Sequence, residues 1–301
     1  MNILIGNFDE GSIERISRSK EIKSENIVME LLRNKKSRLG ISIILAFVII
    51  GVIGAVWTPY SPSDTAFTAW QAPTFAHLFG TDYNGHDVFT WFLIGTGISL
   101  FVGFSVAIFS TLLGSLVGLV SGFYGGLLDN ALMRTVDILL IMPVFPLLVI
   151  LSAYLPPTNE TTILILSALS WPFMSRVIRS QVLTLKERPF IKAAILSGMS
   201  GSRIISHEVL KHVLPLIIIN GIYLMVGAIV AQAGLAFFGL GDITSISWGT
   251  SLYWAQAEDA VVYAAWWWIL PPGLSIALIG IAANLFGSGL TEVFGRKTGE
   301  V

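Results

Sequence analysis

The sequence predicts an all-α, polytopic membrane protein. Of its 301 residues, 54% are apolar and only 12% are charged, whereas a soluble domain carries about 25% charged residues. The mean hydropathy is +0.75. Six charge-poor stretches each supply the roughly 20 residues with which a helix crosses the hydrocarbon layer. They cover approximately residues 39–58, 95–122, 131–155, 161–183, 213–240 and 266–294.

The first stretch is expected to remain in the mature protein as a membrane anchor. A long polar segment precedes it, which is the wrong order for a cleaved signal peptide with its short charged start. The predicted organisation is a tail with an amphipathic lead-in at 1–38, a first span at 39–58, an external loop at 59–94, a transmembrane core at 95–294 and a C-terminal tail at 295–301.

The second and third stretches contain residues that usually disturb helices. Gly114, Gly118 and Gly122 recur every four residues in the second, and such small residues let membrane helices approach one another closely. Pro143 and Pro146 interrupt the third. Because neighbouring helices can satisfy the freed backbone groups, these residues predict close packing and kinks rather than loss of helix.

The distribution of basic residues predicts the orientation, because Lys and Arg are retained on the cytoplasmic side. All 18 fall in the N-terminal tail, at the start of the third stretch, between the end of the fourth stretch and the start of the fifth, or after the sixth. The remaining loops hold acidic residues without one Lys or Arg. Both termini are therefore expected in the cytoplasm, which an even number of six spans requires.

Tryptophans gather near the predicted outer boundary. They are Trp57, Trp70, Trp91, Trp248, Trp254, Trp266, Trp267 and Trp268. An interfacial aromatic belt has this distribution. The alternative is that some of the rings stack on a sugar or peptide ligand, and the sequence does not separate the two interpretations.

A short helix is predicted in the cytoplasmic loop 184–212. Pro189 suits a first helical position, and Gly198 suits the left-handed residue just past a helix end. Between them Phe190, Ala193, Ala194 and Ser197 share one face. This face is able to enter a cleft of another protein, while the simpler interpretation is a connecting helix on the membrane surface.

This loop resembles the coupling loop of membrane subunits of ATP-binding-cassette importers. The family pattern is Glu-Ala-Ala, three residues, Gly, nine residues, Ile, any residue, Leu-Pro. The matching residues are Ala193, Ala194, Gly198, Leu214 and Pro215. Lys192 departs from the Glu of the pattern, His212 occupies the Ile position, and 13 residues replace nine before it. Four extra helical residues add about one turn, so the insertion is compatible with a preserved helix face.

Further segments resemble the dipeptide/oligopeptide branch of these importers, in family order over approximately residues 30–294. They include Phe79-Gly80-Thr81-Asp82, Gly122-Phe123-Tyr124-Gly125-Gly126, Trp171-Pro172, Phe237-Phe238-Gly239-Leu240-Gly241, Ser247-Trp248-Gly249 and Asn284-Leu285-Phe286-Gly287. Departures are His86 and Trp91, where the branch usually carries Arg, and Ser288, where it often carries Asp. Because these segments occur together in family order, the chain is identified as a type I importer permease.

The sequence lacks the residue patterns that catalysis or metal binding requires. It has no Gly-Lys pair, which a phosphate-binding loop requires, so the chain is not expected to be an enzyme. His77, His86, His207 and His212 show no zinc-site spacing and are interpreted as solvated loop or boundary residues. No thiol is available, because the chain has no cysteine. Arg134 and Asp137, three residues apart, are expected to form a structural pair on the third span.

The resemblance implies an importer with a second homologous permease subunit, two cytoplasmic ATPase subunits or domains that carry ATP and Mg, and an extracytoplasmic substrate-binding protein. No cofactor in this chain and no nucleic-acid partner are expected. ATPase docking is assigned to Phe190, Ala193, Ala194 and Gly198 with Leu214 and Pro215, and rim contacts to Lys186, Glu187, Arg188, Pro189 and Lys192. Peptides are the expected solute, with oligosaccharides or another solute as the alternative. A self-contained secondary carrier and a membrane scaffold are the rival classes.

Overall fold

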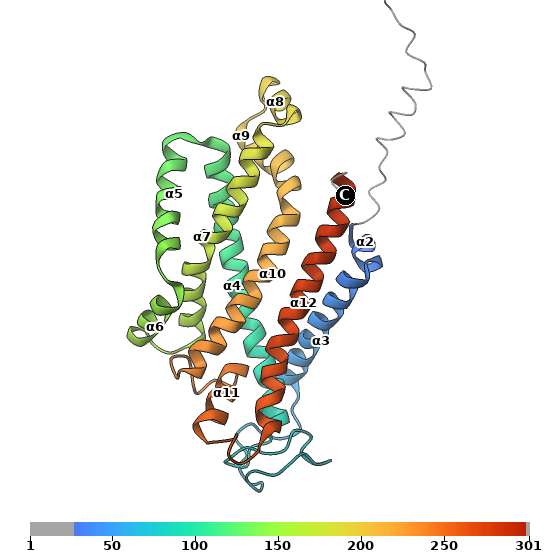
Figure 1. The fold of residues 1–301 in the computed structure, drawn as a ribbon, viewed down its shortest axis with the longest axis vertical. Coiled ribbons are helices and arrows are strands. Elements are labelled where there is room, and N and C mark those ends of the chain that lie inside the picture. The colour runs from blue at the N-terminus through green and yellow to red at the C-terminus, as the bar shows by residue number, and fades with distance from the viewer. Residues whose placement is uncertain (1–26, 299–301) are drawn as a thin grey trace, which may run out of the picture.

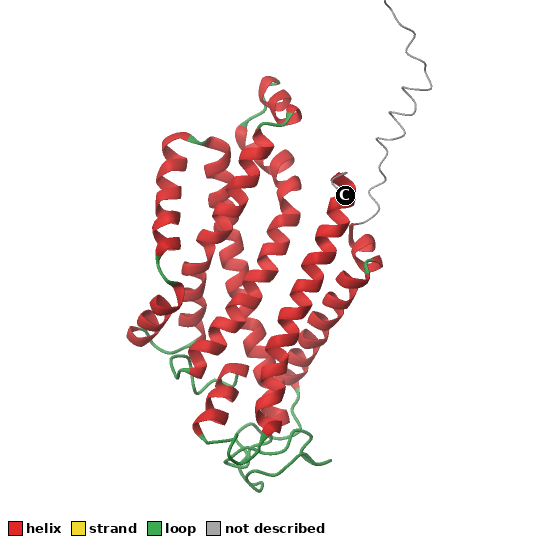
Figure 2. Ribbon diagram, viewed as in Figure 1, coloured by secondary structure: helices red, strands yellow, loops and turns green. Residues whose placement is uncertain are grey.

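The computed structural model describes residues 27–298, and what the sequence predicts for 1–26 and 299–301 lies outside this range. Within it the fold is helical (Figure 2) and has one isolated β-bridge between Thr81 and Asp87. The helices are α2 Ile27–Arg33, α3 Lys35–Val56, α4 Val88–Tyr124, α5 Gly126–Ile141, α6 Val144–Tyr154, α7 Asn159–Lys186, α8 Pro189–Leu196, α9 Gly201–Ile204, the π-helical turn η1 Ile205–Val209, α10 Leu210–Phe237, α11 Trp248–Ala257 and α12 Trp266–Thr298.

The long helices α3, α4, α7, α10 and α12 run side by side as an up-and-down bundle (Figure 1). At one end lie α2, α8, α9 and the described C-terminal end of the chain, and we call this the α8 end. At the other end lie α6, α11 and the loop 57–87. We call these elements, together with the loops that flank α11, the cap. Helix α5 runs along the outside of the bundle.

Five of the helices are long and apolar enough to cross a membrane, and there are up to six such spans if the bent pair α5–α6 is one span. The third predicted stretch, 131–155, is therefore not a continuous helix. It breaks between Ile141 and Val144, where the two axes differ by 86°. Pro143 is the residue at this break, and a proline cannot continue the helical hydrogen bonds.

Local capping groups set where the helices begin. The Asp87 carboxylate accepts a hydrogen bond from the backbone N–H of Thr90 at 2.7 Å, so α4 starts seven residues before the apolar stretch predicted at 95–122. Thr158 caps α7 in the same way through the N–H of Thr161. Gly125 and Gly126 both have positive φ, 67° and 65°, and this pair turns the chain directly from α4 into α5.

The three glycines of α4 place α7 directly against it. A Cβ at Gly114 would lie 2.6 Å from the carbonyl oxygen of Trp171, and one at Gly118 would lie 2.6 Å from that of Ser175. At Gly122 the nearest atom is the Val182 Cβ, at 2.9 Å. The close packing predicted from these glycines is confirmed, and helices at this separation gain van der Waals contacts along the whole seam.

Replacing Gly118 by Ala tests this seam. In most helices Gly→Ala stabilises by about 0.5–1 kcal/mol, but here the added methyl meets backbone, and overpacking costs roughly 1–3 kcal/mol. We therefore expect a lower midpoint of thermal unfolding for purified G118A. Gly273 in α12 is the matched control, because a Cβ there meets nothing within 4 Å. Equal midpoints for G118A and G273A would contradict the packing.

Candidate functional site

Helix α8 projects from the α8 end beyond α7 (Figure 1), and its boundaries follow the predicted punctuation. Pro189 occupies the first turn of the helix. Gly198 has φ +79°, and its backbone N–H donates to the carbonyl of Ile195 at 3.0 Å. The N–H of Met199 donates to the carbonyl of Ala194 at 3.2 Å, which completes the helix terminus. The short helix predicted in loop 184–212 is confirmed.

A buried aliphatic side chain attaches α8 to the bundle. Ile191 is fully buried at 0% exposure, in an apolar cluster that also contains Phe123 of α4, Leu185 of α7 and Ile204 of α9. Burying such a side chain contributes about 1.5–3 kcal/mol. No role was predicted for Ile191 from the sequence, because its burial depends on these tertiary contacts.

The rest of the α8 surface is open. Phe190 is 40% exposed, Ile195 45% and Leu196 88%, while charged groups at Glu187 and Lys192 surround the helix. Ala193 is exposed, but Ala194 is half-buried and packs against the Ile191 cluster. These exposed apolar side chains make α8 the candidate interaction surface of this end. Leu196 is the most exposed of them, and no role was predicted for it from the sequence.

A ring contact ties α8 to α10. The Phe190 ring stacks on the imidazole of His212, with centroids 5.0 Å apart and planes at 29°. The His212 Nδ1 in turn hydrogen-bonds the carbonyl of Glu208 one turn earlier, at 2.7 Å. His212 stands at the Ile position of the family pattern, and in this chain it supplies a flat partner for Phe190.

The charged residues near α8 have different partners. Lys192 pairs with Glu187 at 2.8 Å, and this hydrogen bond, with the lysine charge, lowers the pKa of Glu187. Lys186 instead turns inward, where its Nζ donates to the carbonyl of Phe123 at 2.7 Å and lies 5.8 Å from the Phe123 ring centroid. Lys186 thus closes the C-terminal turn of α4, a different position from the rim contact expected for it.

The segment that follows α8 accommodates the longer spacing before His212. A π-helical turn, Ile205–Val209, joins α9 to α10, so one continuous helix runs from Gly201 to Phe237. Such π-helical turns are rare and are frequent at functional sites. Leu214 is 47% exposed on α10 and Pro215 lies inside α10, so neither belongs to the α8 surface.

Two ion pairs join α5 to α7. Arg179 binds both carboxylate oxygens of Asp129, at 2.6 and 2.7 Å. Asp137 pairs with Arg176, and not with Arg134, so the structural pair predicted on the third span is wrong. An i, i+3 pair on one helix gains only a few tenths of a kcal/mol, while α7 brings an arginine directly opposite Asp137.

The sequence matches the family described as binding-protein-dependent transport system inner membrane component over residues 114–300. A putative peptide transport system permease of Brucella abortus is 35% identical over 265 residues, which cover 87% of this chain and 88% of the relative. A dipeptide transport system permease of Alkalihalophilus pseudofirmus is 33% identical over 270 residues, which cover 89% and 88%. The chain belongs to this family. It is a multi-pass inner-membrane permease component and not an enzyme.

Membership implies partners for the permease. A binding-protein-dependent transport system comprises a substrate-binding protein and an ATPase in addition to its membrane component. The described residues contain no group of three or more His, Asp or Glu side chains able to hold a metal ion.

The cap of the permease contains two His–carboxylate pairs. His77 is 5% exposed and bonds Asp87 at 2.9 Å, the residue that caps α4. His86 bonds Asp82 at 2.7 Å. The interpretation of these two histidines as solvated loop residues is wrong, because the chain folds each against a carboxylate. Burial, with the charges of Glu258 and Asp82, raises the pKa of the neighbouring Tyr83.

Most of the cap tryptophans are packing residues. Trp248 and Trp268 are each 1% exposed and Trp267 is 9% exposed. Trp70 stacks on Tyr263 with centroids 4.6 Å apart, and Tyr83 stacks on Trp268 at 5.9 Å. The belt interpretation fits Trp57 and Trp266, which are 60% and 58% exposed. Trp267 and Trp268 instead form an apolar cluster at the cap, and Trp248 packs on Phe47 in the bundle.

The two α5–α7 pairs allow a matched test. Arg179→Met leaves the Asp129 carboxylate, 11% exposed, without its partner, and an unpaired buried charge costs about 3 kcal/mol or more. Adding Asp129→Asn is expected to recover part of this loss. Arg176→Met breaks a pair whose side chains are 57% and 54% exposed and is expected to cost under about 1 kcal/mol. Thermal unfolding in detergent measures all three; equal losses for R179M and R176M would refute the assignment.

Proposed function

We propose that this chain is one permease subunit of an ATP-driven peptide importer. The printed names of the relatives, a peptide and a dipeptide transport system permease, support peptides as the solute. The alternative of oligosaccharides rested on external tryptophans free to stack on sugar rings. Burial of Trp248, Trp267 and Trp268 removes most of that support.

The ATPase docks on α8 in this proposal. The observation that carries it is the division of α8 into two faces, one anchored by the buried Ile191 and one presenting the 88% exposed Leu196. Because the anchored face packs on α4, α7 and α9, a force applied to the open face is transmitted to the bundle. Phe190, Ala193 and Leu196 form the contact, with Glu187, Arg188 and Lys192 at its rim and Gly198 at its end.

The α8 end faces the cytoplasm in this proposal. Described basic residues from α2 and α3, from the loop after α7 and from α10 lie at this end, as the retention of Lys and Arg in the cytoplasm requires. ATP and Mg bind to the partner ATPases, since the sequence has no Gly-Lys pair. A second homologous permease supplies the other half of the pathway, and the cap receives the substrate-binding protein.

Leu196→Glu tests the docking surface. The side chain is almost fully exposed, so the change removes no packing within the chain, but it places a charge in the proposed apolar contact. Central contact residues of interfaces cost 2 kcal/mol or more when lost, and we expect binding-protein-dependent peptide uptake to fall at least about tenfold. Membrane insertion should be unchanged. Uptake of radiolabelled trialanine by proteoliposomes holding the complete importer measures the effect.

Leu127→Glu is the matched control, because Leu127 is 89% exposed at the same end of the molecule but lies on α5. It is expected to retain uptake. Ala194→Glu is a weaker test, because Ala194 is half-buried against the Ile191 cluster and its replacement also disturbs folding. Normal uptake by L196E would sink the docking proposal.

A further inference from the structure

A cavity of about 270 Å³ opens between α6, α7 and α10. The residues of α10 that line the cavity lie on one face of that helix, because positions separated by three or four residues share a face. They include Asn220, Tyr223, Gly227 and Ala231. The facing walls are Val144 and Leu148 of α6 and Leu166, Ser170 and Phe173 of α7. The break between α5 and α6 brings α6 across this space.

Polar groups face the cavity close to mid-helix. Asn220 stands 19 residues from the start and 17 from the end of the continuous helix Gly201–Phe237. Its Nδ2 donates to the carbonyl of Leu216 at 2.8 Å, which leaves the Oδ1 without a partner among the described residues. Ser170 adds a hydroxyl from α7. Polar side chains at such depth are costly in lipid and usually face a partner or water.

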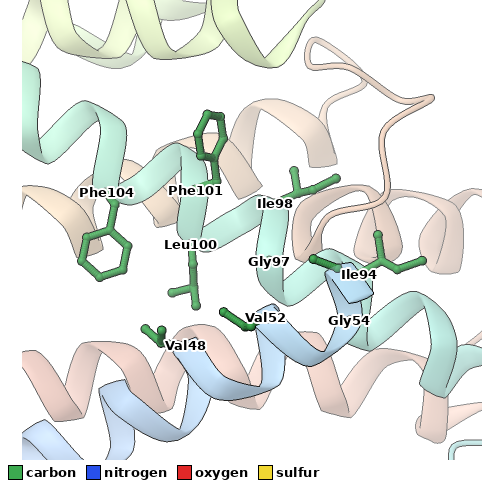
Figure 3. Close-up of a pocket in the computed structure, with 11 residues that line it drawn as sticks. Val48, Val52, Gly54, Ile94, Gly97, Ile98, Leu100, Phe101 and Phe104 are labelled. Atoms are coloured by element: carbon green, nitrogen blue, oxygen red, sulfur yellow. The ribbon is translucent and has the colours of Figure 1, made fainter. Parts of the chain in front are cut away.

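Two other grooves of the bundle differ in kind. The groove between α3 and α4, with Val48 and Val52 opposite Leu100 (Figure 3), is lined by aliphatic, aromatic, alanine and glycine residues. The groove between α4 and α10 includes Ile218 and Ile222, and Thr111 is its one hydroxyl residue. Lipid chains or other apolar helices suit both grooves. The cavity with Asn220 is the one that combines an amide and hydroxyls.

We infer that the cavity between α6, α7 and α10 is a water-filled section of the solute pathway, in which Asn220 and Ser170 hydrogen-bond the main-chain amides of a passing peptide. This inference rests on the proposed function for the identity of the solute. Among the lining residues none is charged. An uncharged wall with few polar groups is able to contact the backbone that all peptides share. Its affinity for any one peptide is low, so the peptide is released.

Introduced cysteines test whether the cavity holds water. The chain has no cysteine of its own, so single replacements can be labelled on this subunit without background. We expect Ser170→Cys and Gly227→Cys to react with a membrane-impermeant charged thiosulfonate in the assembled importer. Ile218→Cys, on the same helix but in the apolar α4–α10 groove and 42% exposed, is the control and should react at least about tenfold more slowly, because the reagent requires water.

Filling the cavity with a larger side chain tests whether solute passes through it. At Gly227 an added Cβ meets nothing within 4 Å, so Gly227→Leu folds without strain but projects into the cavity. We expect uptake of radiolabelled trialanine to fall at least about tenfold, since passage depends on the diameter and lining of the pathway. Gly273→Leu, which also meets nothing within 4 Å but lies on α12 outside this cavity, should retain uptake. Binding-protein-stimulated ATP hydrolysis should persist in both variants.

The outcomes separate this inference from the proposed function. Cavity cysteines that react no faster than Ile218→Cys would overturn the inference, as would normal uptake by G227L. If the unmodified importer takes up no trialanine, the peptide proposal fails instead. The labelling arm still decides in that case whether the cavity is aqueous, because it needs no transported solute.

Discussion

The contact on which the rest of the structure depends is the seam between α4 and α7. Gly114, Gly118 and Gly122 remove side chains from one stripe of α4, and the α7 backbone occupies that space. Because lipid provides no hydrophobic drive between helices, such close contact is a main source of their association. Beyond Gly122 the seam ends in the apolar cluster that contains Phe123 and Ile191, so the position of α8 follows from it.

From this seam the α8 end is built as one connected unit. Lys186 binds the last turn of α4, Ile191 enters the cluster beneath α8, and Phe190 stacks on His212 of α10. Residues of α4 and α7 therefore share one apolar cluster with α8, and α10 contacts α8 through His212. A partner that moves α8 must also move α4, α7 or α10, and packed helices of this kind shift between discrete arrangements rather than deform continuously. The cavity beside Asn220 lies between two of these helices.

The sequence predicted the features whose causes are local. Apolar length located the spans, and Pro189 with Gly198 delimited α8, because caps and hydropathy act within a few residues. Features that depend on distant partners were missed: Asp137 meets Arg176 of α7, His77 meets Asp87, and Trp248 enters the core. The division of α8 into a buried and an open face was equally hidden, since Ile191 and Leu196 are both aliphatic and only tertiary contacts distinguish them.

The most direct test of the account is a cross-link. Because the chain has no cysteine, Leu196→Cys in the assembled importer offers a single thiol on α8, and Tyr154→Cys, at a position 86% exposed on α6, offers one toward the opposite end. With a short thiol-to-amine cross-linker, the account predicts that Leu196→Cys joins the ATPase subunit and that Tyr154→Cys does not. Cross-linking of the ATPase through Tyr154→Cys, or its absence from Leu196→Cys, would contradict the assignment of α8 as the coupling element.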